Sequence, residues 1–195
     1  MSEVLQPAAI PAASPVTKRG KRRVAVPLRR RPYDLVLVAF FLVNLLLITY
    51  GMDLEQLVVP DPAHFQYPIW PLPVVIDLAH WWGRTFDPLQ WARPPWWKAT
   101  IWIDALCFGP FYAVAVYAYV KGKDWIRLPS ILWSSAMLTI VVMILSEEIY
   151  GPHASPQLGM VLLANLPWLA VPIAVIVRMW SEKPFASGET GEEPV

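Results

Sequence analysis

Four long apolar stretches, separated by charged or proline-bearing connections, constrain the fold of this chain more than any other feature. They cover residues 35–52, 99–120, 128–146 and 158–177. About 20 predominantly apolar residues in a helix cross the hydrocarbon core of a bilayer, so each stretch is long enough to span it. The sequence therefore predicts an all-α fold: a four-helix transmembrane bundle with a partly helical first loop that caps it.

The composition favours the same class of protein. The chain is 56% hydrophobic and 16% charged, whereas soluble chains average roughly 45–50% apolar and about a quarter charged residues. The first apolar run starts too late for a secretory signal peptide and has no small-residue cleavage pattern after it. We therefore expect an integral, multi-pass membrane protein.

The basic residues predict the orientation of the bundle. Half of the sixteen Lys and Arg residues lie between Lys18 and Arg31, directly before the first apolar stretch. The turn between the second and third stretches is also basic, and the turn between the third and fourth has no Lys or Arg. Basic loops stay in the cytoplasm, so we expect both termini there. The membrane is the bacterial inner membrane or the endoplasmic reticulum, depending on the source.

Composition also divides the chain into three parts. Residues 1–31 are rich in Ala, Pro and basic side chains, and residues 181–195 are polar and acidic, so both are expected to be disordered tails. The membrane domain is residues 32–180. Beside a membrane helix, the basic tail favours contact with anionic lipid over nucleic acid, so no nucleic-acid partner is expected.

The long connection between the first two apolar stretches is too apolar for an exposed loop. Within it, residues 74–86 place apolar side chains at helical spacing, which predicts a short amphipathic helix at the interface or over the bundle. Asp87 followed by Pro88 indicates an N-cap and the start of another short helix. We expect this loop to cover a cavity.

Two carboxylates are the strongest candidates for a polar site. Asp104 lies inside the second apolar stretch, where an ionisable side chain costs at least about 2.5–3.5 kcal/mol and needs a partner or a pathway. Asp53 ends the first stretch on the same side of the membrane. If the two face each other they cannot both ionise, so they share one proton and carry about one negative charge. Such a pair would attract an amphipathic cation or a sterol hydroxyl.

Other residues are weaker candidates for the same site. Asn165 and Trp168 lie three apart in the fourth stretch, and Thr139 lies in the third. Prolines in the second and fourth stretches bend helices, which either leaves room for a ligand or reflects ordinary kinks. The aromatic residues Trp102, Phe108 and Phe111 are expected to form walls of the site.

Several classes of site find no support in the sequence. Glu147 and Glu148 end the third stretch at the interface, where we expect both to be solvated. The three histidines have no second ligand at metal spacing, and Cys107 is the single cysteine. Phosphate-binding loops and nucleophile triads are absent. We therefore expect no metal and no cofactor, and assign no catalytic residue.

An ordered set of short motifs resembles the sigma-2 receptor branch of the EXPERA family, which also contains the emopamil-binding proteins. The motifs, which fall within about residues 33–180, are Met52-Asp53-Leu54, Phe86-Asp87-Pro88-Leu89, Pro94-Pro95-Trp96-Trp97-Lys98, Gly109-Pro110-Phe111, Lys121-Gly122 and Trp125-Ile126-Arg127. The resemblance implies a four-helix membrane fold with a lipid-accessible pocket for sterols and amphipathic amines.

The resemblance also implies roles for individual residues. The position of Asp53 binds the ligand amine in that branch, and Asp104 stands where the family has a glutamate that pairs with it. Asp87 matches an aspartate that supports the site structurally, and Trp168 stands at a pocket-lining aromatic position. Substituting aspartate for glutamate at residue 104 shortens the reach of the side chain by one methylene.

Three functions remain open at this point. The first is binding of a sterol or isoprenoid lipid or an amphipathic amine. The second is an isomerase that shifts a double bond, because residues 165–168 resemble the Asn-x-x-Trp segment of the family's sterol isomerases. Against it, the first stretch lacks their histidine-then-glutamate arrangement. The third is a lipid-trafficking or structural protein, and a homodimer is among the expected assemblies.

Overall fold

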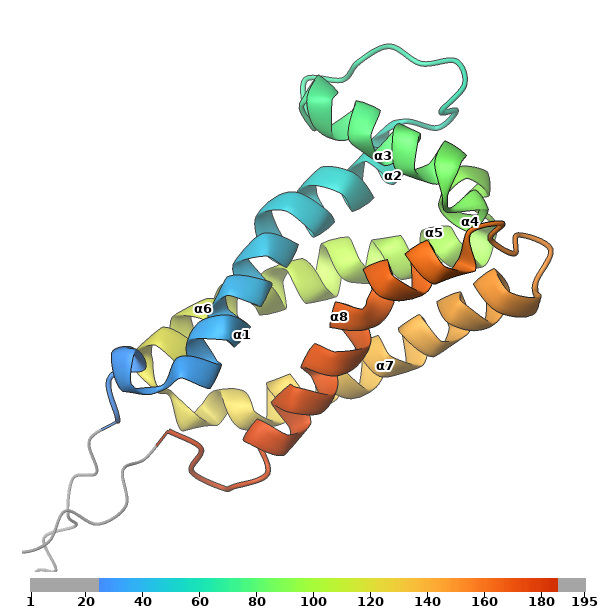
Figure 1. The fold of residues 1–195 in the computed structure, drawn as a ribbon. Coiled ribbons are helices and arrows are strands. Elements are labelled where there is room, and N and C mark those ends of the chain that lie inside the picture. Colours follow the sequence, from blue (N-terminus) through green and yellow to red (C-terminus); the bar gives the residue numbers. More distant parts are fainter. Residues whose placement is uncertain (1–24, 186–195) are drawn as a thin grey trace, which may run out of the picture.

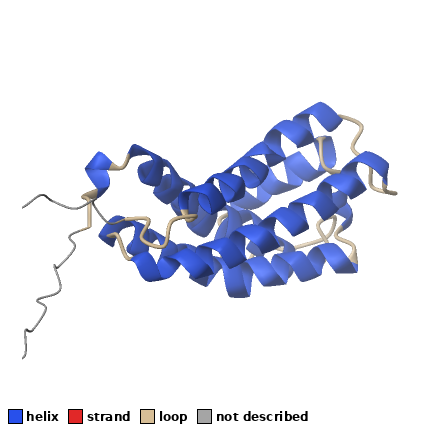
Figure 2. Cartoon of the chain, turned by 90° about the horizontal axis from the view of Figure 1, so that it is seen from below, coloured by secondary structure: helices blue, strands red, loops and turns tan. Residues whose placement is uncertain are grey.

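The computed structural model describes residues 25–185, and this part of the chain contains helices and no strand (Figure 2). Four helical rods are long and apolar enough to cross a membrane: Pro32–Val58, Pro95–Lys121, Asp124–Tyr150 and Leu158–Arg178. The prediction of an all-α bundle with four spans is therefore confirmed. Each of the first three rods extends beyond its apolar stretch at both ends, because helical hydrogen bonding continues into the more polar flanking residues.

The first two spans are not uniform α-helices. The first consists of α1 (Pro32–Val43), the π-helical segment η2 (Asn44–Asp53) and α2 (Leu54–Val58). The second consists of α5 (Pro95–Ile103), the π-helical segment η3 (Asp104–Phe108) and α6 (Gly109–Lys121). A π-helical turn holds an extra residue, so each segment rotates the side chains that follow it and often marks a functional site.

The last two spans form a close pair. The third consists of the short 3-10 turn η4 (Asp124–Ile126) and α7 (Arg127–Tyr150), and the fourth is α8 (Leu158–Arg178). Pro167 and Pro172 lie inside α8, which continues through both. Helix α7 packs mainly against α8, and α1 packs against α6 (Figure 1). The bundle is therefore two helix pairs.

The loop between the first two spans forms a helical cap. It contains α3 (Pro73–Thr85) and α4 (Pro88–Ala92), and Figure 1 shows both at the end of the bundle opposite the termini. The Asp87 side chain accepts a 2.7 Å hydrogen bond from the backbone N–H of Gln90 and so caps α4. The predicted amphipathic helix, the predicted N-cap and the capping loop are confirmed.

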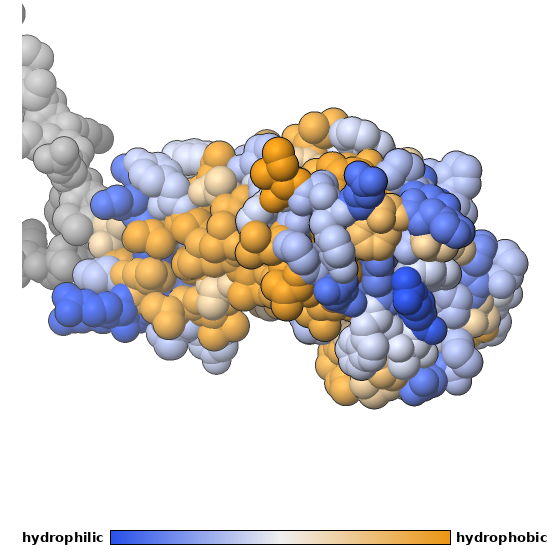
Figure 3. Space-filling view, turned by 90° about the horizontal axis from the view of Figure 1, so that it is seen from above, coloured by the Kyte–Doolittle hydropathy of each residue, from blue (hydrophilic) through white to orange (hydrophobic). Residues whose placement is uncertain are grey.

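The outer surface of the rods is apolar. At most 33% of the residues in each span's most apolar window are buried inside the protein. Figure 3 shows apolar side chains as a band along the bundle, with hydrophilic side chains toward both ends. Contact between so much apolar surface and water is unfavourable, whereas contact with lipid hydrocarbon is not. The chain is an integral membrane protein.

Inside the bundle, aromatic side chains form the core between the two helix pairs. Phe41 is completely buried, and its ring packs against Tyr112, Tyr119 and Trp133 with centroids 5.4–6.0 Å apart. Edge-to-face and offset contacts of this kind add to the stabilisation that burial provides. This core lies below the cap, on the side of the termini, and leaves space nearer the cap.

A polar cluster closes the end of the bundle near the termini. Asp34 is fully buried and accepts hydrogen bonds from Arg31 and Arg178. Phe185 lies against both guanidinium groups, and the short 3-10 turn η1 (Leu28–Arg30) precedes Arg31. The predicted domain boundaries at residues 31 and 181 thus leave out two short segments that pack on the bundle. The remainder of both predicted tails lies outside the described residues.

Candidate functional site

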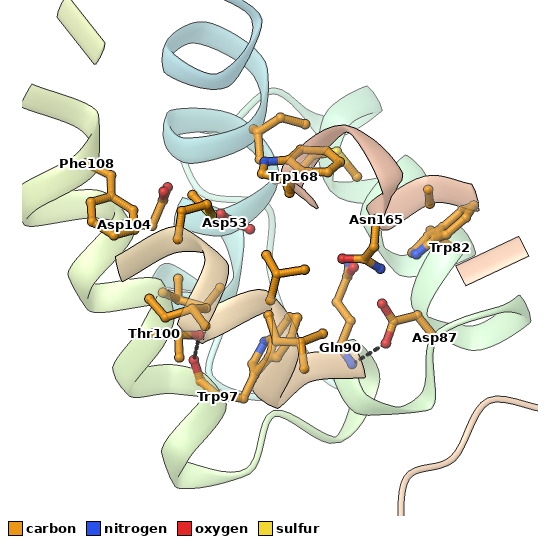
Figure 4. A pocket seen from close by; sticks show the side chains of 18 residues that line it. Asp53, Trp82, Asp87, Gln90, Trp97, Thr100, Asp104, Phe108, Asn165 and Trp168 are labelled. Atoms are coloured by element: carbon orange, nitrogen blue, oxygen red, sulfur yellow. Dashed lines mark hydrogen bonds between the residues drawn. The ribbon is translucent and has the colours of Figure 1, made fainter. Parts of the chain in front are cut away.

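A cavity of about 340 Å³ lies between the spans and the cap. All four spans contribute to its wall, together with Trp82 of α3 and Gln90 of α4. Its surface is mostly apolar, with side chains such as Ile48, Ile101 and Val141. Figure 4 shows a few polar groups pointing toward this space. An apolar cavity with a small number of polar groups is typical of small-molecule binding sites.

Asp53 and Asp104 meet in this cavity. Asp53 ends η2, Asp104 begins η3, and both line the wall. The two carboxyl groups lie on the same side of the cavity (Figure 4). One oxygen of Asp104 lies 3.5 Å from the Tyr112 hydroxyl, and the other is buried without a partner among the described residues. Both residues thus lie at an end of a π-helical segment.

A chain of hydrogen bonds fixes Asp53. The amide nitrogen of Gln56, which is 2% exposed, donates to Asp53 Oδ1 at 3.4 Å. The amide oxygen of Gln56 accepts from Trp97 Nε1, whose ring lines the cavity. Sequence reasoning missed Gln56 and Trp97. The spacing of Asp53 and Gln56, three residues apart on one helix face, was the available signal.

Close packing of the first two spans holds the acid pair together. The hydroxyl of Tyr50 donates to the backbone carbonyl of Ala105 at 3.1 Å. Tyr50 also lies against Gly109, where a Cβ atom would be 2.6 Å from the Tyr50 hydroxyl oxygen. Glycine leaves room for this approach, which occurs close to both Asp53 and Asp104 along their helices.

Trp168 and Asn165 line the cavity from α8. The ring N–H of Trp168 donates to the side-chain oxygen of Asn44 at 2.9 Å, and Asn44 in turn donates to the carbonyl of Phe40. Asn165 donates to the carbonyl of Val161, one turn back on α8. A polar residue of the first span thus orients the indole of the fourth.

Asp87 lines the cavity at the cap, and Glu148 is its neighbour on α7. Glu148 is 1% exposed, and neither of its oxygens has a hydrogen-bond partner among the described residues. The expectation that Glu147 and Glu148 are both solvated is therefore wrong for Glu148, because the cap folds over that face of α7. Glu147 lies at the rim, with its carboxylate 2.7 Å from Nδ1 of His153.

Three residues expected at the site lie elsewhere. Thr139 is exposed on the outer face of α7, where its hydroxyl donates to the carbonyl of Ser135 one turn back. Trp102 is 51% exposed and does not line the cavity, whereas Phe108 does. Phe111 packs in the aromatic core against Trp133 instead. The helical period turns the first two away, since their neighbours at 100–101 and 140–141 face the cavity.

A buried ion cluster anchors the cap above the site. Glu55 is fully buried and accepts two 2.9 Å hydrogen bonds from Arg93 and one 2.7 Å contact from His80. Arg93 also donates to the carbonyl of Val59. The spacing of the histidines in the sequence did not indicate this cluster. Between residues 25 and 185 no group of acidic, His and Cys side chains has the arrangement of a metal site.

Comparison with known proteins agrees with the geometry. The family model described as EXPERA (EXPanded EBP superfamily) matches residues 74–179, more than half of the chain. "Sigma intracellular receptor 2" of Xenopus tropicalis is 29% identical over 151 residues, which cover 72% of this chain and 84% of the relative. The Macaca fascicularis and Homo sapiens proteins of that name are each 33% identical over 131 residues, covering 65% of this chain and 68% of each relative. Because the family model covers more than half of the chain, the chain belongs to the EXPERA family.

Proposed function

We propose that this protein binds a sterol, an isoprenoid lipid or an amphipathic amine in the cavity, with Asp53 and Asp104 as its polar recognition pair. The observation that supports the proposal is that Asp53 and Asp104, which come from different spans, line one mostly apolar cavity. Two carboxyl groups held close together where the dielectric is low cannot both ionise. The pair therefore holds one proton and one negative charge.

This arrangement suits a ligand with one polar end and an apolar body. An ammonium group pairs with the ionised carboxylate, and a hydroxyl can donate to it and accept from the protonated partner. The rings of Trp97, Phe108 and Trp168 line the same space and favour a cation through their π faces. The volume is at the lower end of the range typical of ligand pockets, roughly 300–1,000 Å³. The related proteins named above are receptors, which also favours ligand binding.

Replacement of Asp53 by Asn tests the proposal. The substitution keeps the size of the side chain and removes the charge, so affinity for a radiolabelled amphipathic amine should fall about tenfold to a hundredfold. Asp77→Asn is the matched control, because Asp77 is exposed on α3 and accepts a hydrogen bond from Tyr67 outside the cavity. Unchanged binding in Asp53→Asn would favour a lipid-trafficking or structural protein whose buried acids serve only the fold.

An isomerase is the second candidate, favoured by Asn165 and Trp168 lining the same cavity as Asp104. In such a reaction protonated Asp104 would donate its proton to one alkene carbon, and Asp53 would accept a proton from the allylic carbon. The double bond moves and no atom is gained or lost. Migrated double bonds in lipids extracted from expressing cells, absent with Asp104→Asn, would establish this activity.

The proposal includes an orientation in the membrane. Both termini lie in the cytoplasm, with the basic N-terminal segment against anionic lipid, and the cap and the 151–157 turn lie on the other side. The supporting observation is the distribution of Lys and Arg between the turns. A cysteine introduced at Ser155 should react with an impermeant thiol reagent only from the non-cytoplasmic side. Reaction from the cytoplasm would reverse the assignment.

A further inference from the structure

The cavity contains a second acidic position that the recognition pair does not use. Figure 4 shows Asp53 and Asp104 on one side of the cavity and Asp87 on the other, near Gln90 and Asn165. Asp87 is 6% exposed and lines the wall. One of its oxygens caps α4 by accepting from the backbone N–H of Gln90. Capping α4 requires only the Asp87 carboxyl group. It does not explain why a second carboxyl group lies beside Asp87.

Glu148 is that second carboxyl group. It lies against the Asp87 carboxyl, is 1% exposed, and has no hydrogen-bond partner among residues 25–185. Helix α7 presents Val141 and Ile144 to the cavity, and Glu148 follows at the next position of the same helix face. Its side chain therefore extends the cavity-facing stripe of α7 toward Asp87.

No Lys, Arg or His side chain within residues 25–185 forms an ion pair with either carboxyl group. In the described part of the chain, the ion pairs of Lys, Arg and His involve Asp34, Glu55, Asp61 and Glu147, and none involves Asp87 or Glu148. Two adjacent buried carboxyl groups cannot both ionise. Asp87 and Glu148 therefore share one proton. One negative charge then remains at this end of the cavity.

We propose that the ligand is a two-headed amphiphile with a protonated amine at each end of an apolar body. One amine pairs with Asp53 and Asp104, and the other pairs with Asp87, which Glu148 supports. The apolar middle of the ligand contacts Ile101 and Ile140, which line the wall. This inference rests on the proposed function, because the first amine uses the recognition pair.

Two probes of equal length test the inference on the full-length protein in lipid nanodiscs. They are a long-chain alkyl monoamine and the α,ω-diamine with the same number of carbons. The measured quantity is the ratio of their affinities, compared between variants so that partitioning into lipid cancels. Asp87→Asn keeps the N-cap, since Asn caps as well as Asp, and removes the charge. We expect it to reduce the preference for the diamine at least about tenfold, the effect of losing one charge-assisted hydrogen bond.

Glu147→Gln is the matched control, because Glu147 contacts His153 at the rim rather than Asp87. The affinity ratio should be the same in this variant as in the wild type. A ratio unaffected by Asp87→Asn would overturn the inference, as would an equal fall in Glu147→Gln. A different outcome would separate the two proposals. If the monoamine binds Asp53→Asn more weakly than the wild type, but Asp87→Asn does not change the affinity ratio, the proposed function holds and only the role of Asp87 is wrong. If the wild type binds neither probe, the proposed function and the inference both fail.

Discussion

Replacing Gly109 by Ala should separate the first two spans where they hold the acid pair. Gly109 is buried and has helical dihedrals, so the backbone itself accepts alanine. The added Cβ, however, would lie 2.6 Å from the Tyr50 hydroxyl oxygen, 2.8 Å from Tyr50 Cζ and 3.1 Å from Thr49 Cγ2. The Tyr50 ring cannot turn away without losing its hydrogen bond to Ala105.

The size of the effect follows from two opposing terms. Overpacking a tight contact costs about 1–3 kcal/mol, and replacing Gly by Ala within a helix returns roughly 0.5–1 kcal/mol. We expect a net loss of about 1–2 kcal/mol of unfolding free energy. Because Tyr50 lies less than one turn from Asp53, amine affinity should also fall several-fold.

The assay is unfolding in mixed micelles, followed by tryptophan fluorescence, together with amine binding. Gly159→Ala is the matched control, because Gly159 is also helical and a Cβ there meets no atom within 4 Å. It should leave stability unchanged or slightly raised. Adding Tyr50→Phe to Gly109→Ala removes the nearest clashing atom and should restore part of the loss. If Gly109→Ala is as stable as the wild type and binds the amine equally well, this close approach does not hold the site.

Two further substitutions test the cap and the outer face of α7. Arg93→Met should lower the free energy of unfolding by about 3–5 kcal/mol, because it leaves Glu55 buried without the Arg93 guanidinium. Adding Glu55→Gln should recover part of this loss in the same unfolding assay. The absence of any recovery would contradict the ion-pair explanation. Thr139→Val should change the free energy of unfolding by less than about 0.5 kcal/mol and leave amine affinity unchanged, since Thr139 is exposed. A loss of amine affinity would show that Thr139 contributes to the binding site.

Local patterns were sufficient for the cap. The amphipathic spacing of residues 74–86 and the Asp87-Pro88 pair specify α3 and the start of α4 without reference to the rest of the chain. A helix start and an amphipathic face are properties of a few consecutive residues, so the sequence contains them completely.

The rotation of the spanning helices was not accessible in the same way. A span that faces lipid on one side and protein on the other is apolar on both, so periodicity does not reveal the inner face. Thr139 was placed inward for this reason, and Trp102 likewise, whereas both face outward. Their orientations depend on contacts with other helices.

The sequence by itself determined that this chain crosses a membrane four times and that Asp53 and Asp104 lie in or beside apolar surroundings. Only the tertiary structure decided which side chains meet. Asp53 at the end of η2 and Asp104 at the start of η3 line one cavity, and Glu148 is buried beside Asp87. The physical reason is that hydrophobicity fixes where a residue lies along the membrane normal, whereas packing between distant segments fixes the direction in which it points.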